Sequence, residues 1–248
     1  MSHIHIPDGI IPFYIWLPGY MLTFAIIYIV IKTINKEQIK RVLPFTGIAA
    51  ALMLIGMSVP LIIIPVHISL AVLTGILIGP KMAFLVVFVV SMILAMFGHG
   101  GITIVGLNTL VIGSEVFIGA ILFKGLAKKN LVVGTSIATV IALIVSMSMM
   151  VGVIGTYAGF AEVLPHEVHE HDEEGHLDEE HLDEGHHDDS SLIEVVREIN
   201  YLAFSGWAAL IMIVVAGIGL ETLITVLIIR YFYKVRPDLI ETVHGFTM

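Results

Sequence analysis

The sequence predicts an all-α fold, a polytopic bundle of membrane-spanning helices, and two observations support this prediction. The chain is 57% hydrophobic and 13% charged, with a mean hydropathy of +0.98, whereas soluble domains average about 45–50% apolar and about 25% charged residues. Apolar runs recur along the whole chain, and a spanning helix needs roughly 20 apolar residues. There is no cysteine, which excludes disulfides, thiolate metal sites and cysteine nucleophiles.

Charged residues, glycines and prolines divide the chain into seven apolar segments within one membrane domain, residues 1–248. The third and fourth segments are short and are separated by Gly79, Pro80 and Lys81. They therefore predict a helical hairpin of uneven depth. In chain order, we expect spans near 12–32, 44–65, 68–79, 82–98, 104–125, 131–158 and 201–232.

The basic residues orient these seven spans, because Lys and Arg concentrate in cytoplasmic loops. With the amino terminus outside, eleven of the twelve Lys and Arg fall on the cytoplasmic side, and only Arg197 falls outside. Merging 68–98 into one span would divide the basic clusters between the two faces. We therefore predict about seven spans, an external amino terminus and a cytoplasmic carboxyl terminus. This topology leaves His244 in the cytoplasmic tail and places four candidate residues outside, namely His3, His5, His67 and His99.

The net charge of −9 comes from one segment. Residues 162–189 hold 13 Asp or Glu and no Lys or Arg, so the rest of the chain carries +4. The low apolar content predicts a disordered extracytoplasmic loop. It is either a solvated low-complexity insertion or a weak metal buffer, since imidazole and carboxylate groups bind divalent ions. Its seven histidines are His166, His169, His171, His176, His181, His186 and His187.

Two internal histidines are candidate ligands. His67 lies between two apolar runs, where it is either an interfacial residue bonded to a carbonyl or a metal ligand. An ionisable residue at membrane depth is a functional candidate, and His3 and His5 on the same side favour the ligand interpretation. His99 lies among glycines, which permit tight turns, so it is either an exposed turn residue or part of the site.

Four polar residues have supporting roles in this prediction. Asn108 either orients a ligand or bonds neighbouring helices. Asp8 orients the terminal segment or caps a helix. Glu115 and Glu221 lie inside spans, where hydrogen bonding within the bundle is favoured over a transport role.

The amino-terminal segment, residues 1–10, predicts a metal site. His3 and His5 lie directly before the first apolar run. A terminal amine, backbone amides and imidazoles together form a set of nitrogen ligands suited to a transition metal.

These motifs, taken together, resemble the NikM/CbiM family, the substrate-capture components of energy-coupling factor nickel and cobalt transporters. The resemblance covers essentially the whole membrane body, and the histidine-acid loop is similar to a variable insertion. The motifs are His-Ile-Pro-Asp-Gly at 5–9, Val66-His67 with Gly75 and Gly79-Pro80, and Gly98-His99-Gly100-Gly101 with Gly106-x-Asn108.

The resemblance implies a helical bundle that binds Ni(II) or Co(II) near the outer surface of a prokaryotic cell membrane. It implies three kinds of partner: a transmembrane coupling subunit, cytoplasmic ATPases and a small accessory membrane subunit. The ligands it implies are the terminal amine, the amide and imidazole of the adjacent histidine, and an internal histidine, here His67.

The amino terminus departs from the family pattern, which commonly begins Met-His-Ile-Pro and aligns that histidine with His5. Removal of Met1 would leave Ser2 and His3 to supply the amine, amide and imidazole, with His5 as a supporting or fourth ligand. Alternatively, His5 keeps the family position and binds without the amine. We favour the first arrangement.

Planar nitrogen ligands with a deprotonated amide favour Ni(II), with Co(II) as the alternative substrate. A second class is a self-sufficient secondary transporter or channel for divalent cations, for which only Glu115 and Glu221 are available within spans. A third, a membrane metalloenzyme, lacks a paired base and ligand motif. His166-Glu167-Val168-His169 is not a zinc-protease motif, and no phosphate-binding glycine loop is present. We therefore expect no enzyme, no organic cofactor and no nucleic-acid partner, with ATP hydrolysis in a separate chain.

Overall fold

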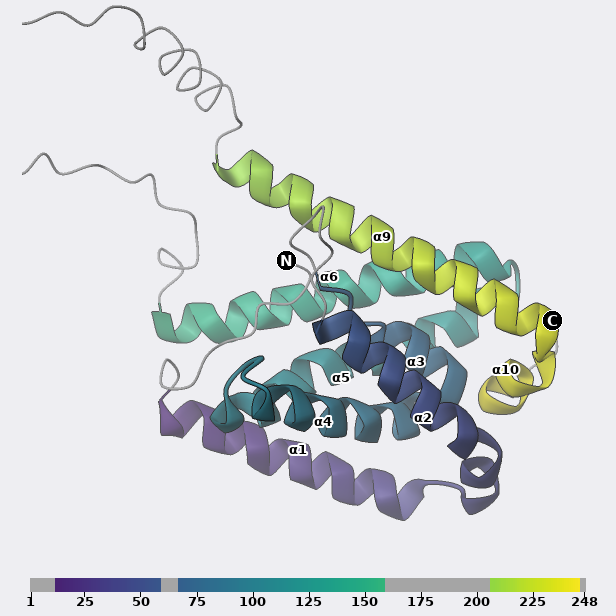
Figure 1. Cartoon of the computed structure of the whole chain (residues 1–248), viewed down its shortest axis with the longest axis horizontal. Helices are drawn as coiled ribbons and strands as arrows, with labels where there is room; N and C mark the ends of the chain where they lie inside the picture. The colour runs from purple at the N-terminus through teal and green to yellow at the C-terminus, as the bar shows by residue number, and fades with distance from the viewer. Residues whose placement is uncertain (1–11, 59–66, 159–205, 246–248) are drawn as a thin grey trace, which may run out of the picture.

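The computed structural model describes residues 12–58, 67–158 and 206–245, and every regular element in these ranges is a helix. The helical class predicted from the sequence is therefore confirmed, and each of the seven apolar segments contributes one helix (Figure 1). The elements are α1 Phe13–Thr33, α2 Lys36–Ser58, α3 Ala71–Ile78, α4 Pro80–Met96, the 3-10 turn η1 Ile102–Ile104, α5 Val105–Leu126, α6 Leu131–Ala158, α9 Gly206–Val235 and α10 Pro237–His244.

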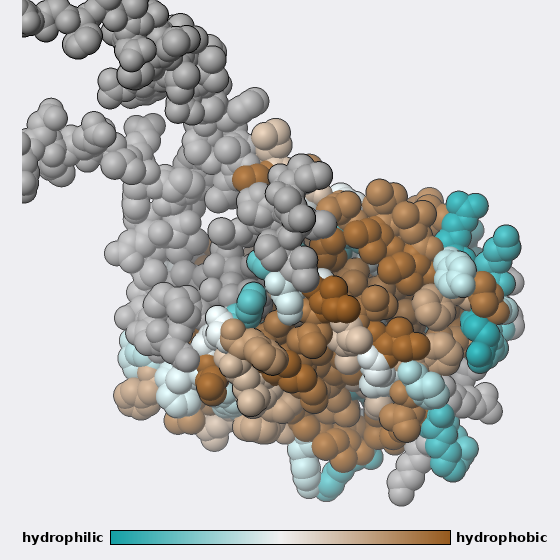
Figure 2. All heavy atoms as spheres, in the orientation of Figure 1, coloured by the Kyte–Doolittle hydropathy of each residue, from teal (hydrophilic) through white to brown (hydrophobic). Residues whose placement is uncertain are grey.

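Four helical segments are long and apolar enough to cross a bilayer, namely 13–33, 102–126, 131–153 and 211–235. Their outward faces are apolar: on α1, for example, Tyr14, Met21 and Ile29 are all more than half exposed. Such faces suit a lipid environment. Hydrophobic residues also cover the visible flank of the bundle in Figure 2, while hydrophilic residues gather toward its ends.

The third segment is shorter than predicted, because α3 has eight residues, all of them buried. Eight helical residues rise about 12 Å, far less than the roughly 30 Å hydrocarbon core, so α3 cannot cross a membrane by itself. Gly79 ends it with a φ of 84° and ψ of 151°, and Pro80 begins α4. The uneven hairpin is thus observed, and the number of spans stays a prediction.

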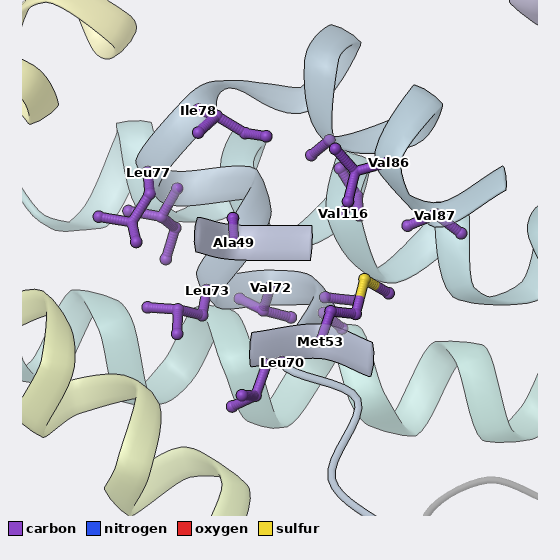
Figure 3. Packing of buried hydrophobic residues seen from close by; sticks show 14 of the residues in the cluster. Ala49, Met53, Leu70, Val72, Leu73, Leu77, Ile78, Val86, Val87 and Val116 are labelled. Carbon is purple, nitrogen blue, oxygen red and sulfur yellow. The ribbon is translucent and has the colours of Figure 1, made fainter. Parts of the chain in front are cut away.

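Helix α3 is the centre of the hydrophobic core. Val72 and Leu73 are completely buried, as are Met53 of α2, Val87 of α4 and Val116 of α5, which pack in the same cluster (Figure 3). Packing on all sides by apolar helices explains how a helix this short is retained, since isolated helices of such length are unstable. Residues 68–70, which lead into α3, are buried together with this core.

The helix junctions bring the basic residues of the described chain to one end of the bundle. At this end, Lys81 at the start of α4 donates to the carbonyl of Thr33 at the end of α1, 2.8 Å away. Helix α2 begins at Lys36, earlier than the predicted span, because the Asn35 side chain accepts a hydrogen bond from the Glu37 amide. We call this the lysine end. The opposite end carries His67 and His99, and we call it the histidine end.

Candidate metal site

His67 lies half-buried just before α3, in a segment fixed to the end of α2. The amide of Ile68 donates to the carbonyl of Gly56 across 3.1 Å. A Cβ atom at Gly56 would lie only 2.6 Å from the Ile68 carbonyl oxygen, so only glycine allows this close approach. The backbone next to His67 is therefore held by α2 on one side and α3 on the other.

His99 is placed by the end of α4. Its amide donates to Leu94 across 2.9 Å, while the Gly98 amide donates to Ala95 across 3.1 Å. This pair of bonds, with Gly98 at a φ of 78°, is the Schellman arrangement that ends many helices. The motif fixes His99 in the turn between α4 and α5.

The fold brings the two internal histidines together. The ring centroids of His67 and His99 are 6.4 Å apart, and the ring planes are at 86°. The sequence placed both residues on one side of the bundle, and this is confirmed. Within the described residues, no group of three or more His, Asp or Glu side chains is arranged to hold a metal ion, so the structure shows these two histidines as a pair.

The chain also enters the described fold at the histidine end. Trp16, near the start of α1, packs against a small cluster containing Ile104 of η1. The Tyr20 hydroxyl donates to the carbonyl of Ile102, and the Thr23 hydroxyl donates to that of Gly106 across 2.8 Å. The start of α1 therefore lies beside the turn that carries His99.

Behind His67 lies a buried polar cluster. Ser69 Oγ is 2.8 Å from Glu115 Oε2 of α5 and 2.5 Å from Glu221 Oε1 of α9. Glu221 also accepts from the amides of Ser69, at 3.3 Å, and Leu70, at 3.0 Å. The Ser146 hydroxyl of α6 donates to Glu115. Glu115 and Glu221 thus hydrogen-bond inside the bundle, as predicted.

Sequence reasoning missed two residues. Ser69 joins Glu115 to Glu221, and a small polar residue two positions after His67 in a buried run was the available signal. His244, expected in a cytoplasmic tail, is buried with its Nε2 2.9 Å from the carbonyl oxygen of Ile76. The amphipathic run that forms α10 gives the physical reason, since its apolar face packs on α3.

A family profile and two solved structures match this chain. The profile of the CbiM family, described as the cobalt uptake substrate-specific transmembrane region, matches residues 5–239. The chain belongs to the CbiM family. Its members are membrane components of cobalt- and nickel-type uptake systems that work with other transporter components. Among curated proteins no match was found.

Two solved structures share the fold. A transition metal transporter has a TM-score of 0.64 at 19% identity, over 94% of this chain and 93% of its own. A truncated transition metal transporter has a TM-score of 0.55 at 22% identity, over 61% of this chain and 74% of its own. Both likenesses concern the helical fold, while the family match makes the chain a transporter component of the membrane.

Most of the predicted ligands lie outside the described residues. These are His3, His5 and Ser2 with Asp8, and the loop histidines His166, His169, His171, His176, His181, His186 and His187. Of the other candidates, Asn108 is half-buried on the first turn of α5. The terminal chelate and the metal-buffering loop, 162–189, therefore stay predictions.

Proposed function

We propose that this chain is the substrate-capture subunit of an ATP-driven energy-coupling factor importer for Ni(II). It would bind the ion near the outer face of a prokaryotic cell membrane. The observation that carries the proposal is the meeting of His67 and His99 at the end of the bundle where α1 begins. Imidazole nitrogens and a terminal amine are ligands that transition metals accept.

In this proposal, His67 binds the metal together with the amine of a processed Ser2 and the amide and imidazole of His3. His5, Asp8, His99 and Asn108 complete or orient that ligand set. Four nitrogen ligands in a plane favour Ni(II), and Co(II) is the alternative substrate. The lysine end would face the cytoplasm, where basic residues concentrate and where the coupling subunit and ATPases would act.

A self-sufficient transporter or channel is less well supported. Such a protein needs ionisable residues along a path through the membrane. In the described chain, the carboxyl groups of Glu115 and Glu221 are already bonded to Ser69 and Ser146. Their hydrogen bonds therefore favour a structural role inside the bundle over a role in a cation path.

The test is metal binding by the purified full chain, measured by titration calorimetry with Ni(II) and Co(II). His67→Ala should weaken Ni(II) binding by more than the ~10–100-fold typical of losing an outer-shell partner. His244→Phe is the matched control at the lysine end and should bind normally, as should a chain lacking residues 166–189. Wild-type affinity in His67→Ala would refute the site.

The terminal chelate has its own arm in this experiment. An amino-terminal extension would move the free amine away from the ion, so binding should be lost. Retained Ni(II) affinity in the extended chain would exclude the amine as a ligand and leave His5 as the terminal candidate. The mass of the mature amino terminus would show whether Met1 is removed.

A further inference from the structure

The carboxyl groups behind His67 must share a proton, because Ser69 has a single hydroxyl hydrogen. Its Oγ lies within hydrogen-bonding distance of both Glu115 and Glu221, and it also accepts from the amide of Ala71 across 3.2 Å. Ser69 can donate to one carboxyl group only. The other must donate to Ser69, so one of the two glutamates is a neutral carboxylic acid.

Three observations identify Glu221 as the ionised member. It accepts from two backbone amides, those of Ser69 and Leu70, and amide donors stabilise a carboxylate. Its carboxyl group lies at the amino terminus of α3, where the helix dipole favours negative charge. Its 2.5 Å distance to Ser69 Oγ also falls in the range of about 2.5–2.7 Å expected for a hydroxyl donating to a carboxylate.

Glu115 then completes the network as the acid. Its Oε2 hydroxyl donates to Ser69 Oγ across 2.8 Å, an ordinary distance between neutral oxygens. Its other oxygen accepts from the Ser146 hydroxyl. Every donor in this assignment meets an acceptor, which is the condition for a stable buried polar network.

The network acts on the backbone that carries His67. Leu70 has a φ of 52°, in the left-handed region that costs a residue with a side chain about 1–2 kcal/mol. Its amide is the one that Glu221 accepts at 3.0 Å. The chain turns into α3 at this residue, three positions after His67, and the turn is therefore held by the carboxylate of α9.

We propose that ionised Glu221, supported through Ser69 by a neutral Glu115, is a positioning residue that holds His67 in place for metal binding. The role rests on the proposed function of His67 as a ligand. It assigns the two glutamates different charges and different tasks: Glu221 anchors the backbone, and Glu115 supplies the proton that lets Ser69 bond to both.

The assignment predicts opposite outcomes for two isosteric variants. Glu115→Gln replaces the acid with a neutral amide that donates to Ser69 and accepts from Ser146, so Ni(II) affinity should stay within about twofold. Glu221→Gln turns an amide NH2 toward the backbone N–H groups, so affinity should fall about 10–100-fold, as for other outer-shell residues. The visible absorption bands of bound Ni(II) should also change in Glu221→Gln only.

Infrared spectroscopy tests the proton itself. The wild-type protein at pH 7 should show the C=O stretch of a buried carboxylic acid, and Glu115→Gln should lose it. If Glu221→Gln does not fold, Ser69→Ala replaces it in the binding assay, where a smaller loss is expected because both backbone bonds to Glu221 remain. Equal affinity in Glu221→Gln and the wild type, or an acid band that persists in Glu115→Gln, would overturn the assignment.

The two proposals fail separately. Loss of Ni(II) binding in His67→Ala with normal binding in Glu221→Gln would leave the proposed function intact and refute the positioning role. A wild-type protein that binds neither Ni(II) nor Co(II) would refute both. The infrared result would still decide which glutamate holds the proton.

Discussion

The two ends of α3 are held by side chains of opposite character. At the histidine end, Glu221 of α9 accepts from the amides of Ser69 and Leu70. At the lysine end, Nε2 of His244 in α10 donates to the carbonyl of Ile76 across 2.9 Å. A helix leaves N–H groups unpaired at its start and carbonyl groups unpaired at its end. An acceptor at one end and a donor at the other therefore match what α3 lacks.

The difference between the ends lies in charge and in neighbourhood. At the histidine end, Glu221 belongs to a hydrogen-bonded network of three helices next to His67. At the lysine end, the His244 ring packs against Phe123, with ring centroids 4.9 Å apart. Both contacts should contribute to the stability of α3. Only the first should affect metal binding, because only it holds the backbone of His67.

The largest effect is expected from Glu221→Ala. This change leaves the amides of Ser69 and Leu70 and the Ser69 hydroxyl buried with fewer partners, and each unmet group costs about 1–3 kcal/mol. We expect a loss of stability of about 3 kcal/mol or more, seen as a lower Tm of the purified protein in detergent. Thr222→Ala is the matched control, because the Thr222 hydroxyl is buried and makes no hydrogen bond within the described residues. Equal Tm values for the two variants would contradict a stabilising role of Glu221 at the histidine end.

The sequence predicted the histidine end better than the lysine end. His67 and His99 each follow an even-numbered apolar segment, so topology alone placed them on one side, and the structure brings their rings to 6.4 Å. The position of Ser69 in a buried run marked it as notable, but its two partners could not be predicted, because Glu115 and Glu221 lie 46 and 152 residues away. Such contacts depend on helix packing, which no local pattern encodes.

The length and burial of α3 also could not be predicted from the sequence. A short apolar run has the same composition whether lipid or protein surrounds it, and periodicity gives no signal when all eight residues are buried. His244 was missed for a related reason: we assigned it to a cytoplasmic tail, and no local pattern predicted that its ring is buried. The buried face of α10 became evident only from its contacts with α3.

An intermediate effect is expected from His244→Phe. The phenyl ring preserves most of the packing against Phe123 but cannot donate to Ile76, and the loss of one buried hydrogen bond costs about 1–2 kcal/mol. The Tm should therefore fall less than in Glu221→Ala. Ni(II) affinity should match that of the wild type in the same titration. A joint loss of affinity would show that the two ends of α3 are coupled and do not act separately.

The smallest effect is expected from pH. Burial lowers the pKa of His244 below its ordinary value of 6.5, Lys124 lowers it further, and the Ile76 carbonyl opposes this only in part. The folded protein therefore keeps the ring neutral, while the unfolded chain takes up a proton below about pH 6.5. The stabilisation is complete above that pH and is lost as the pH falls from 6.5 toward the lowered pKa.

The Tm advantage of the wild type over His244→Phe should therefore shrink between pH 7 and pH 5. Because the other histidines are common to both proteins, their titration cancels in this difference. A Tm difference that stays constant over this range would mean that the ring at the lysine end keeps its ordinary pKa.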